Sequence, residues 1–266
     1  MNHRESWVNN KNVPLLDKQN IRNNNIFFLY AFLGDGFNIE KIQILKNLER
    51  WKKQNTNWNI NILRKDYDKI MTFVERHFPW FLNVYINYPK NIQKCDTIRY
   101  MLMYHYGGAY SDLDVFPNLS LSNLLMTYPK ANVIFGVGRI KSKEKCIKTT
   151  EIESIRDGIL EIPTRLSNYF FVSRIPNHPI WIDILNLALE RSKKTIQSQY
   201  GIIYTTGPDL VTTAVYNNIH KYNDIVIIPY EGFQKLYVHE AASFNDKNSW
   251  RTRTNLPVDE SGSNNV

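Results

Sequence analysis

The chain has 266 residues, of which 43% are hydrophobic, so it can bury the core of one domain and is not a wholly disordered protein. Its formal net charge of +8 suits a nucleic acid, an anionic membrane surface or a phosphorylated ligand, but the basic residues are spread along the sequence. Because no zinc pattern, helix-turn-helix or RNA-recognition motif accompanies this charge, we expect no nucleic-acid partner.

The distribution of polar residues divides the chain into three segments. Residues 1–25 form a polar leader whose composition is compatible with disorder and which lacks the apolar stretch of a secretory signal. Residues 26–250 are predicted to form a single domain, and residues 251–266 a disordered tail. The longest apolar run, residues 26–33, is far shorter than the ~20 residues of a membrane-spanning helix. We therefore expect no transmembrane segment and a cytoplasmic protein.

Apolar periodicity predicts strands and helices in alternation. The expected elements are strand 25–33, a helix from residue 39, strand 58–63, helices 67–78 and 96–106, strands 109–117, 132–138 and 167–173, helices 179–192 and 209–219, and a last strand 224–230. In the first helix Ile42, Leu45 and Leu48 recur every three residues, as on one apolar face. A later helix is expected to begin near Asp96, which can cap its first turn, and to stop at Gly107.

This order of elements predicts an α/β fold with a mostly parallel sheet flanked by helices. The charged, poorly periodic segment 141–163 is the expected insertion or lid.

Two carboxylates one residue apart, Asp112 and Asp114, are the most informative feature of the sequence. In an extended strand they share one face with Tyr110, and two like charges so close repel each other unless a cation lies between them. Carboxylate oxygens suit Mn²⁺ or Mg²⁺, and such an ion keeps positions open for phosphate oxygens. A pair of aspartates in a solvated turn is the alternative interpretation.

The surrounding residues resemble a known family. Residues 95–117 read CDTIRYMLMYHYGGAYSDLDVFP and contain, in order, Asp96, Arg99, Gly107, Gly108, Tyr110, Asp112 and Asp114. This pattern is similar to that of the Och1-like DXD-containing glycosyltransferases of family 32, which include inositol-phosphoceramide mannosyltransferases and are related to the clostridial glucosylating toxins. Further similar landmarks are Asn168, His178-Pro179, Thr206-Gly207-Pro208, His239 and Ser249-Trp250.

The resemblance implies a GT-A-type, Rossmann-like glycosyltransferase. Such an enzyme uses Mn²⁺ or Mg²⁺ and moves a hexose, with retained configuration, from a nucleoside diphosphate sugar to a hydroxyl of a glycan, lipid or protein acceptor. The implied metal ligands are Asp112, Asp114 and His239. The implied donor-binding residues are Asp96, Arg99, Tyr110, Asp112, Asn168 and Trp250. The implied catalytic residues are Asp96, Arg99 and Asp112.

Two other functions remain open at this point. A phosphotransferase like the haloacid dehalogenases also carries a D-x-D motif, but Gly107 and Gly108 interrupt the apolar strand that it requires. A non-catalytic protein of the same fold would bind a sugar nucleotide or a glycan without turnover. Within the transferase hypothesis, mannosyl, glucosyl and galactosyl transfer are equally compatible with the sequence.

Overall fold

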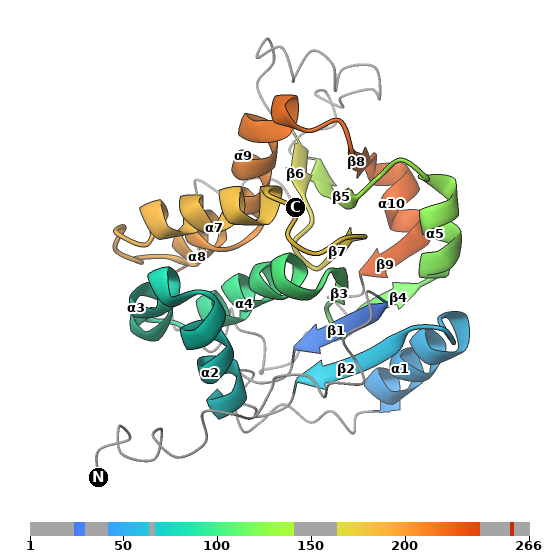
Figure 1. The fold of residues 1–266 in the computed structure, drawn as a ribbon, viewed down its shortest axis with the longest axis horizontal. Coiled ribbons are helices and arrows are strands. Elements are labelled where there is room, and N and C mark those ends of the chain that lie inside the picture. The colour runs from blue at the N-terminus through green and yellow to red at the C-terminus, as the bar shows by residue number, and fades with distance from the viewer. Residues whose placement is uncertain (1–23, 30–41, 64–66, 141–163, 240–255, 258–266) are drawn as a thin grey trace.

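The computed structural model describes residues 24–29, 42–63, 67–140, 164–239 and 256–257 (Figure 1). The strands are β1 (Asn25–Leu29), β2 (Asn59–Leu63), β3 (Gly108–Ser111), β4 (Val115–Pro117), β5 (Val133–Ile140), β6 (Thr164–Leu166), β7 (Phe170–Ser173), β8 (Ile225–Ile228) and β9 (Tyr237–His239). The helices are α1 (Ile42–Gln54), α2 (Tyr67–His77), α3 (Pro79–Asn87), α4 (Asn91–Tyr106), α5 (Leu121–Thr127), α7 (Ile180–Arg191), α8 (Gln199–Thr205), α9 (Pro208–Asn218), the 3₁₀ turn η4 (Ile219–Lys221) and α10 (Tyr230–Leu236). Within these ranges, no helix combines the length and the apolar character that crossing a bilayer requires.

Seven strands form the central sheet, in the order β2-β1-β3-β7-β5-β6, with β8 paired to β5. Strand β1 runs parallel to β2 and β3, and β5 runs parallel to β8, whereas β7 is antiparallel to both β3 and β5. Five of the seven strands therefore share one direction, and β6 and β7 oppose it. This arrangement confirms the predicted α/β class with a mostly parallel sheet flanked by helices.

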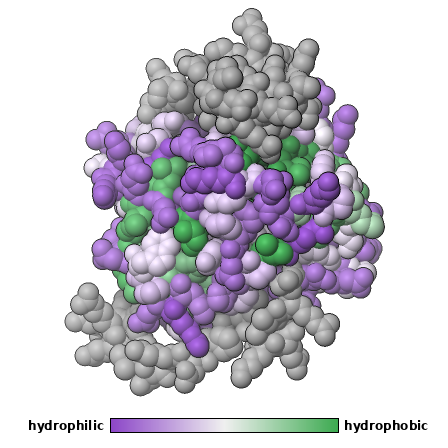
Figure 2. Space-filling model, turned by 45° about the horizontal axis from the view of Figure 1, so that its top comes forward, coloured by the Kyte–Doolittle hydropathy of each residue, from purple (hydrophilic) through white to green (hydrophobic). Residues whose placement is uncertain are grey.

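Each face of the sheet covers its own hydrophobic core, because successive side chains of a strand point to opposite faces. Phe27 of β1 and Phe171 of β7 belong to the core under α2, α3, α4, α7 and α9. Phe28 and Phe170, one position away in each strand, belong to the core under α1, α5 and α10. The two groups of helices lie on opposite sides of the sheet in Figure 1. On the face drawn in Figure 2, hydrophobic residues form only small, separate patches among hydrophilic ones.

Two glycines let α4 turn directly into β3. Gly107 and Gly108 have φ angles of +66° and +93°, a region that side chains with a Cβ rarely adopt. A Cβ on Gly108 would stand 2.3 Å from the backbone oxygen of Asn25, so β3 can lie against β1 only because this residue has no side chain. The Gly-Gly pair thus brings the two predicted functional segments, α4 and the D-x-D turn, to adjoining places in the sheet.

Four details differ from the sequence expectations. Helix α4 begins at Asn91 and not near Asp96, because Gln93 takes the capping role by accepting a hydrogen bond from the Lys90 backbone at 3.3 Å. The apolar face of α1 is formed by Ile44, Leu48 and Trp51, whereas Leu45 is exposed.

The other two concern strands. The segment 109–117 is not one strand: β3 ends at Ser111, a turn carries the two aspartates, and β4 leaves the main sheet to pair with β9. The strand predicted to be the last, β8, is followed by α10 and by a further strand, β9. Leu256 and Pro257 accept hydrogen bonds from Gln199, and the predicted leader lies almost entirely outside the described residues.

Candidate active site

The D-x-D turn links β3 of the central sheet to β4 of the small sheet. The Asp112 backbone nitrogen donates to the Tyr169 oxygen at 2.8 Å, and the Val115 nitrogen closes the turn onto the Asp112 oxygen at 3.2 Å. Helix α1 stabilises the turn, because the buried amide of Asn47 donates hydrogen bonds to the Leu113 and Val115 backbone oxygens, both at 2.8 Å. The two aspartates are therefore brought together by a fixed turn and not by the alternation of one strand.

Strand β9 delivers a third ligand type to the same turn. His239 pairs with Val115 in the small sheet, and its Nε2 lies 3.3 Å from Oδ2 of Asp114. One ligand atom from each of Asp112, Asp114 and His239 lies within 4.8 Å of the others, and all three residues are half-buried. Two carboxylates and an imidazole fit a divalent cation, and the nitrogen ligand suits Mn²⁺ better than Mg²⁺. The predicted metal ligands are thus close enough to share one ion.

Beside this group, a buried ion-pair network joins α4 to the turn. Arg99 lies 3.0 Å from Oδ1 of Asp96 and 3.3 Å from Oδ1 of Asp112, and its side chain is 4% exposed. Its guanidinium also donates to the Asn168 backbone oxygen at 2.6 Å and lies 4.5 Å from the centre of the Tyr110 ring. The structure therefore connects Asp96, Arg99, Tyr110 and Asp112 in one buried network.

The remaining bonds of the two carboxylates come from Thr206 and Asn168, which lie between elements, and from Tyr110 on β3. Asp96 accepts hydrogen bonds from Thr206 at 3.0 Å and from the Asn168 amide at 3.2 Å. Asp112 accepts a short bond of 2.5 Å from the Tyr110 hydroxyl. Thr206 belongs to the Thr-Gly-Pro segment singled out in the sequence, but its bond to Asp96 was not predicted. The sequence pattern marked this segment as a landmark, but it could not predict that Thr206 donates a hydrogen bond to Asp96.

The pKa values of both carboxyls are raised, because burial outweighs the opposing charge of Arg99. Burial raises the pKa of Asp96 to about 7, against the opposing effects of Arg99 and of the Thr206 hydrogen bond. Burial also raises the pKa of Asp112, and the neighbouring Asp114 raises it further, while Arg99 lowers it. A cation near Asp112 would favour its charged form, as Arg99 already does from the other side.

Tyr169 contacts two of the three predicted metal ligands, Asp112 and His239. Its backbone oxygen binds Asp112, and its ring stacks on His239 with centroids 4.2 Å apart and planes 13° apart. Its hydroxyl accepts a hydrogen bond from Gln234 at 2.9 Å. Sequence reasoning missed both Tyr169 and Asn47. The only signal for Asn47 was a polar residue inside the apolar stripe of α1.

Other sequence landmarks have structural positions or lie outside the described residues. His178 is buried, faces Asp224 at 3.3 Å and accepts a hydrogen bond from the Ile180 nitrogen at the start of α7. These contacts fix α7 against β8 and lie apart from the aspartates. Trp250, predicted to bind the donor, falls outside the part of the chain that the structure describes.

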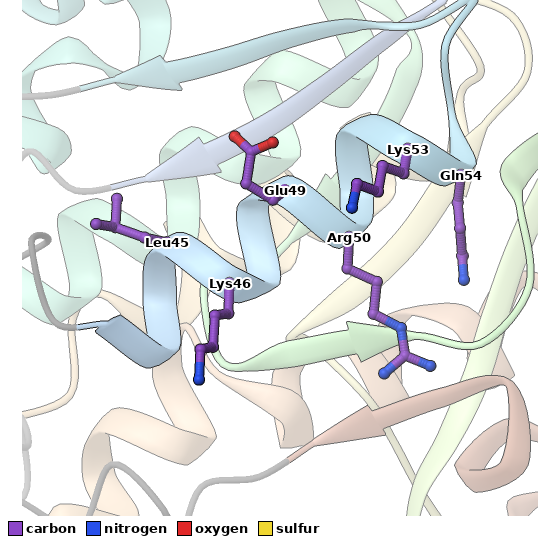
Figure 3. Close-up of a pocket in the computed structure, with 6 residues that line it drawn as sticks. All are labelled: Leu45, Lys46, Glu49, Arg50, Lys53 and Gln54. Carbon is purple, nitrogen blue, oxygen red and sulfur yellow. The ribbon is translucent and has the colours of Figure 1, made fainter.

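A surface hollow lies elsewhere, along α1 (Figure 3). The described residues that line it are Leu45, Lys46, Glu49, Arg50, Lys53 and Gln54. None of them is a predicted site residue, and the stick view shows the three basic side chains extending from one helix. The hollow is therefore a separate surface feature and not the donor site.

An α/β fold with a D-x-D turn beside a buried arginine is compatible with a glycosyltransferase. Residues 43–131 match the family model described as a glycosyltransferase sugar-binding region containing a DXD motif. The matched segment includes the turn and all of α4. This segment is thus similar to the sugar-binding region of DXD glycosyltransferases, in agreement with the resemblance that the sequence indicated.

Its relatives include yeast mannosyltransferases. Inositol phosphoceramide mannosyltransferase 1 of Schizosaccharomyces pombe is 52% identical over 48 residues, which are 18% of this chain and 15% of that protein. Inositol phosphoceramide mannosyltransferase 2 of the same yeast is 29% identical over 169 residues, 53% of this chain and 49% of that protein. The chain therefore spans half or less of the length of these relatives. Among solved structures, the PaToxG glycosyltransferase aligns with a TM-score of 0.48 at 19% identity, over 74% of this chain and 70% of that chain.

The expectation of a cytoplasmic protein is wrong. It rested on the lack of a signal-like or membrane-spanning apolar stretch in the sequence. The yeast relatives are named for mannosyl transfer to inositol phosphoceramide, a membrane lipid, which contradicts that expectation. The physical reason for the error is that a missing apolar span carries no information about the compartment in which a globular domain works.

Proposed function

We propose that this protein is a metal-dependent GT-A-type glycosyltransferase. It transfers a hexose, with retained configuration, from a nucleoside diphosphate sugar to an acceptor hydroxyl. The observation that carries the proposal is the group of Asp112, Asp114 and His239 next to the buried Asp96–Arg99 pair. One part of this site is suited to a diphosphate and its ion, and the other to the hydroxyl groups of a sugar.

A divalent ion bound by Asp112, Asp114 and His239 would supply Lewis-acid stabilisation of the diphosphate leaving group. The protein's own part is to keep its ligands in place before the donor arrives. Both bonds that Asp112 accepts end on its Oδ1, from Tyr110 and Arg99, so among the described contacts Oδ2 keeps its lone pairs for the ion. A carboxylate oriented in this way loses little freedom on binding.

Arg99 and Asp96 serve the donor from the other side. We propose that Arg99 balances Asp112 and donates toward the sugar or its phosphate, while Asp96 accepts from sugar or ribose hydroxyls. Asn168 holds both residues, by its amide and by its backbone oxygen. Because these groups are buried, the charge of Arg99 acts with little screening from solvent.

The relatives' names favour one substrate pair. They are called mannosyltransferases of inositol phosphoceramide. We therefore propose mannose as the transferred hexose and a hydroxyl of an inositol phospholipid or sphingolipid as the first acceptor to assay. Trp250 remains a proposed donor contact on the strength of the sequence resemblance alone.

Release of nucleoside diphosphate from a panel of GDP- and UDP-sugars tests the activity. With Mn²⁺, the wild type should release GDP from GDP-mannose, and EDTA should stop the release. The double variant Asp112→Ala/Asp114→Ala should lose at least about 100-fold in rate, because the ion and its leaving-group stabilisation go together. Asp68→Asn, which changes an exposed carboxylate of α2, is the matched control and should keep the wild-type rate.

The outcomes separate the alternatives. Metal-dependent binding of a sugar nucleotide without release, even with an inositol lipid present, would favour the non-catalytic binding protein. Neither binding nor release with any donor would contradict the proposed function. Release of phosphate from a phosphate monoester, with attachment of the phosphate to Asp112, would instead support the phosphotransferase alternative.

A further inference from the structure

Helix α3 has an outer face without charge. Its nine residues, PWFLNVYIN, include no Asp, Glu, Lys or Arg. Phe81 and Tyr85 are fully buried against the core, yet Trp80 is 42% exposed and Ile86 is 48% exposed. In Figure 1 this helix lies beside α2, on the opposite side of the sheet from α1. The solvent side of this helix therefore carries no charge and exposes two large hydrophobic side chains.

The exposed residues form one continuous face. With a turn of about 100° per residue, Trp80, Asn83 and Ile86 lie within an arc of roughly 120°. Pro79 and Asn87 fall inside the same arc and are exposed as well. In comparison, the solvent side of α1 carries Lys46, Glu49, Arg50 and Lys53. The missing charge thus distinguishes α3 from α1, although the shorter helices α5 and α8 carry no charged residue either.

The charged residues between the end of α3 and Asp96 are both basic. From residue 77 to residue 95 there is no Asp or Glu, and the two charged residues are Lys90 and Lys94. An uncharged face with an exposed Trp and Ile, followed in the sequence by two half-buried lysines, resembles in composition helices that lie in the interface of an anionic bilayer. The lysine stems can extend toward lipid phosphates while the face enters the headgroup layer.

The size of the face argues against a protein partner. Nine helical residues span about 14 Å, and a helix is about 10 Å wide, so the footprint is on the order of 140 Å². A stable protein interface needs roughly 800 Å² on each partner. A small apolar face with basic neighbours can contribute to peripheral membrane binding, because the lipid surface supplies many headgroups at once.

We propose that α3 is a membrane-docking element that lies on an anionic lipid surface, with Trp80 and Ile86 in the headgroup layer and Lys90 and Lys94 facing lipid phosphates. This inference rests on the proposed function, since it supplies the route by which a lipid acceptor reaches the site. Helix α4, which carries Asp96 and Arg99, starts at Asn91, directly after this face. Docking through α3 would thus hold the helix that carries Asp96 and Arg99 next to the membrane.

Vesicle flotation of the full chain tests the proposal without any sugar donor. Wild-type protein should float with vesicles of phosphatidylcholine and phosphatidylserine and bind pure phosphatidylcholine vesicles more weakly. Trp80→Asn/Ile86→Asn should lower the bound fraction at limiting lipid by about tenfold or more, because two interfacial side chains are lost. Lys90→Gln/Lys94→Gln should lower it by several-fold and reduce its sensitivity to salt.

Met126→Asn is the matched control, because Met126 on α5 is 69% exposed but lies outside the face. It should float as the wild type does. Equal flotation of Met126→Asn and Trp80→Asn/Ile86→Asn, or no flotation of the wild type, would overturn the proposal. A wild-type dimer that dissociates in Trp80→Asn/Ile86→Asn, without vesicle binding, would assign the face to a second copy and overturn it as well.

The assay of sugar-nucleotide turnover keeps the two proposals separate. In the absence of lipid, Trp80→Asn/Ile86→Asn should hydrolyse the soluble donor at the wild-type rate, since neither residue contacts the aspartates. Loss of flotation with retained donor hydrolysis supports the docking face by itself. Vesicle binding by a protein that turns over no donor would keep the docking face and remove the proposed function.

Discussion

Arg99 is the residue on which the electrostatics of the site depend. It is the shared partner of Asp96 and Asp112, two carboxylates that approach from different elements. Arginine suits this position because its planar guanidinium carries several donors in fixed directions and stays charged when buried. Its charge opposes the burial that raises the pKa of each carboxyl.

The raised pKa of Asp96 predicts a pH-dependent stability. Its pKa in the folded protein is about 7, above the ~3.9 of an unfolded chain, so the folded state holds the proton more tightly. The stabilising contribution is complete below about pH 4 and is lost as the pH rises through about 7. In EDTA, the free energy of unfolding of the wild type relative to Asp96→Asn should fall across this window, by at most about 1.4 kcal/mol per pH unit.

Urea unfolding of both proteins from pH 4 to pH 8 measures this difference. Asp68→Asn controls for the removal of a surface carboxylate. If the wild-type and Asp96→Asn stabilities followed parallel curves over the whole range, the raised pKa of Asp96 would be wrong.

At the scale of elements, the Gly-Gly junction decides whether α4 and β3 can adjoin. Gly108→Ala should lower the free energy of unfolding by about 2 kcal/mol or more, or prevent folding, because its Cβ meets the Asn25 backbone and its φ is +93°. Gly232→Ala on α10 is the matched control, since the new Cβ meets only Ile228 at 3.4 Å. It should gain up to about 1 kcal/mol of helix propensity. Chemical denaturation compares the two, and equal effects would contradict the steric argument.

Tyr169 contacts both the D-x-D turn and β9 of the small sheet, so its loss should leave the predicted metal ligand His239 less well positioned. Tyr169→Leu should weaken Mn²⁺ binding by about tenfold, because His239 loses the ring on which it stacks. Tyr169→Phe keeps the ring and removes only the hydroxyl bonded to Gln234, so it should bind Mn²⁺ nearly as the wild type does. Titration of Mn²⁺ followed by electron paramagnetic resonance measures both. Equal affinities of the Leu and Phe variants would mean that the ring does not position His239.

At the scale of the whole molecule, the proposed metal would tie together distant parts of the chain. Asp112 and Asp114 follow β3, while His239 lies on the last strand described, so an ion bound to all three stabilises only the folded state. Mn²⁺ at 100 times its dissociation constant should raise the free energy of unfolding by about 2.7 kcal/mol. Thermal unfolding with Mn²⁺ and with EDTA measures this shift. His239→Ala should lose most of it, and an undiminished shift in that variant would place the ion elsewhere.

Much of this protein could be predicted from the order of its residues. The D-x-D spacing, the two glycines before it and the Asp and Arg three residues apart all act locally, through turn geometry and helix periodicity. Local patterns of this kind also determined the α/β class and most of the helices and strands.

Only the tertiary structure decided which of these residues meet, because contacts between distant segments leave no local pattern. Pairing of β4 with β9 brings His239 to Asp114, and the packing of α4 against the D-x-D turn makes Asp96 and Arg99 part of a buried network with Asp112. The role of Asn47 under the D-x-D turn and that of Tyr169 beside His239 depend on packing between elements. The sequence by itself determined the chemical groups and their local geometry, whereas the folded chain determined their partners, their burial and hence their pKa values.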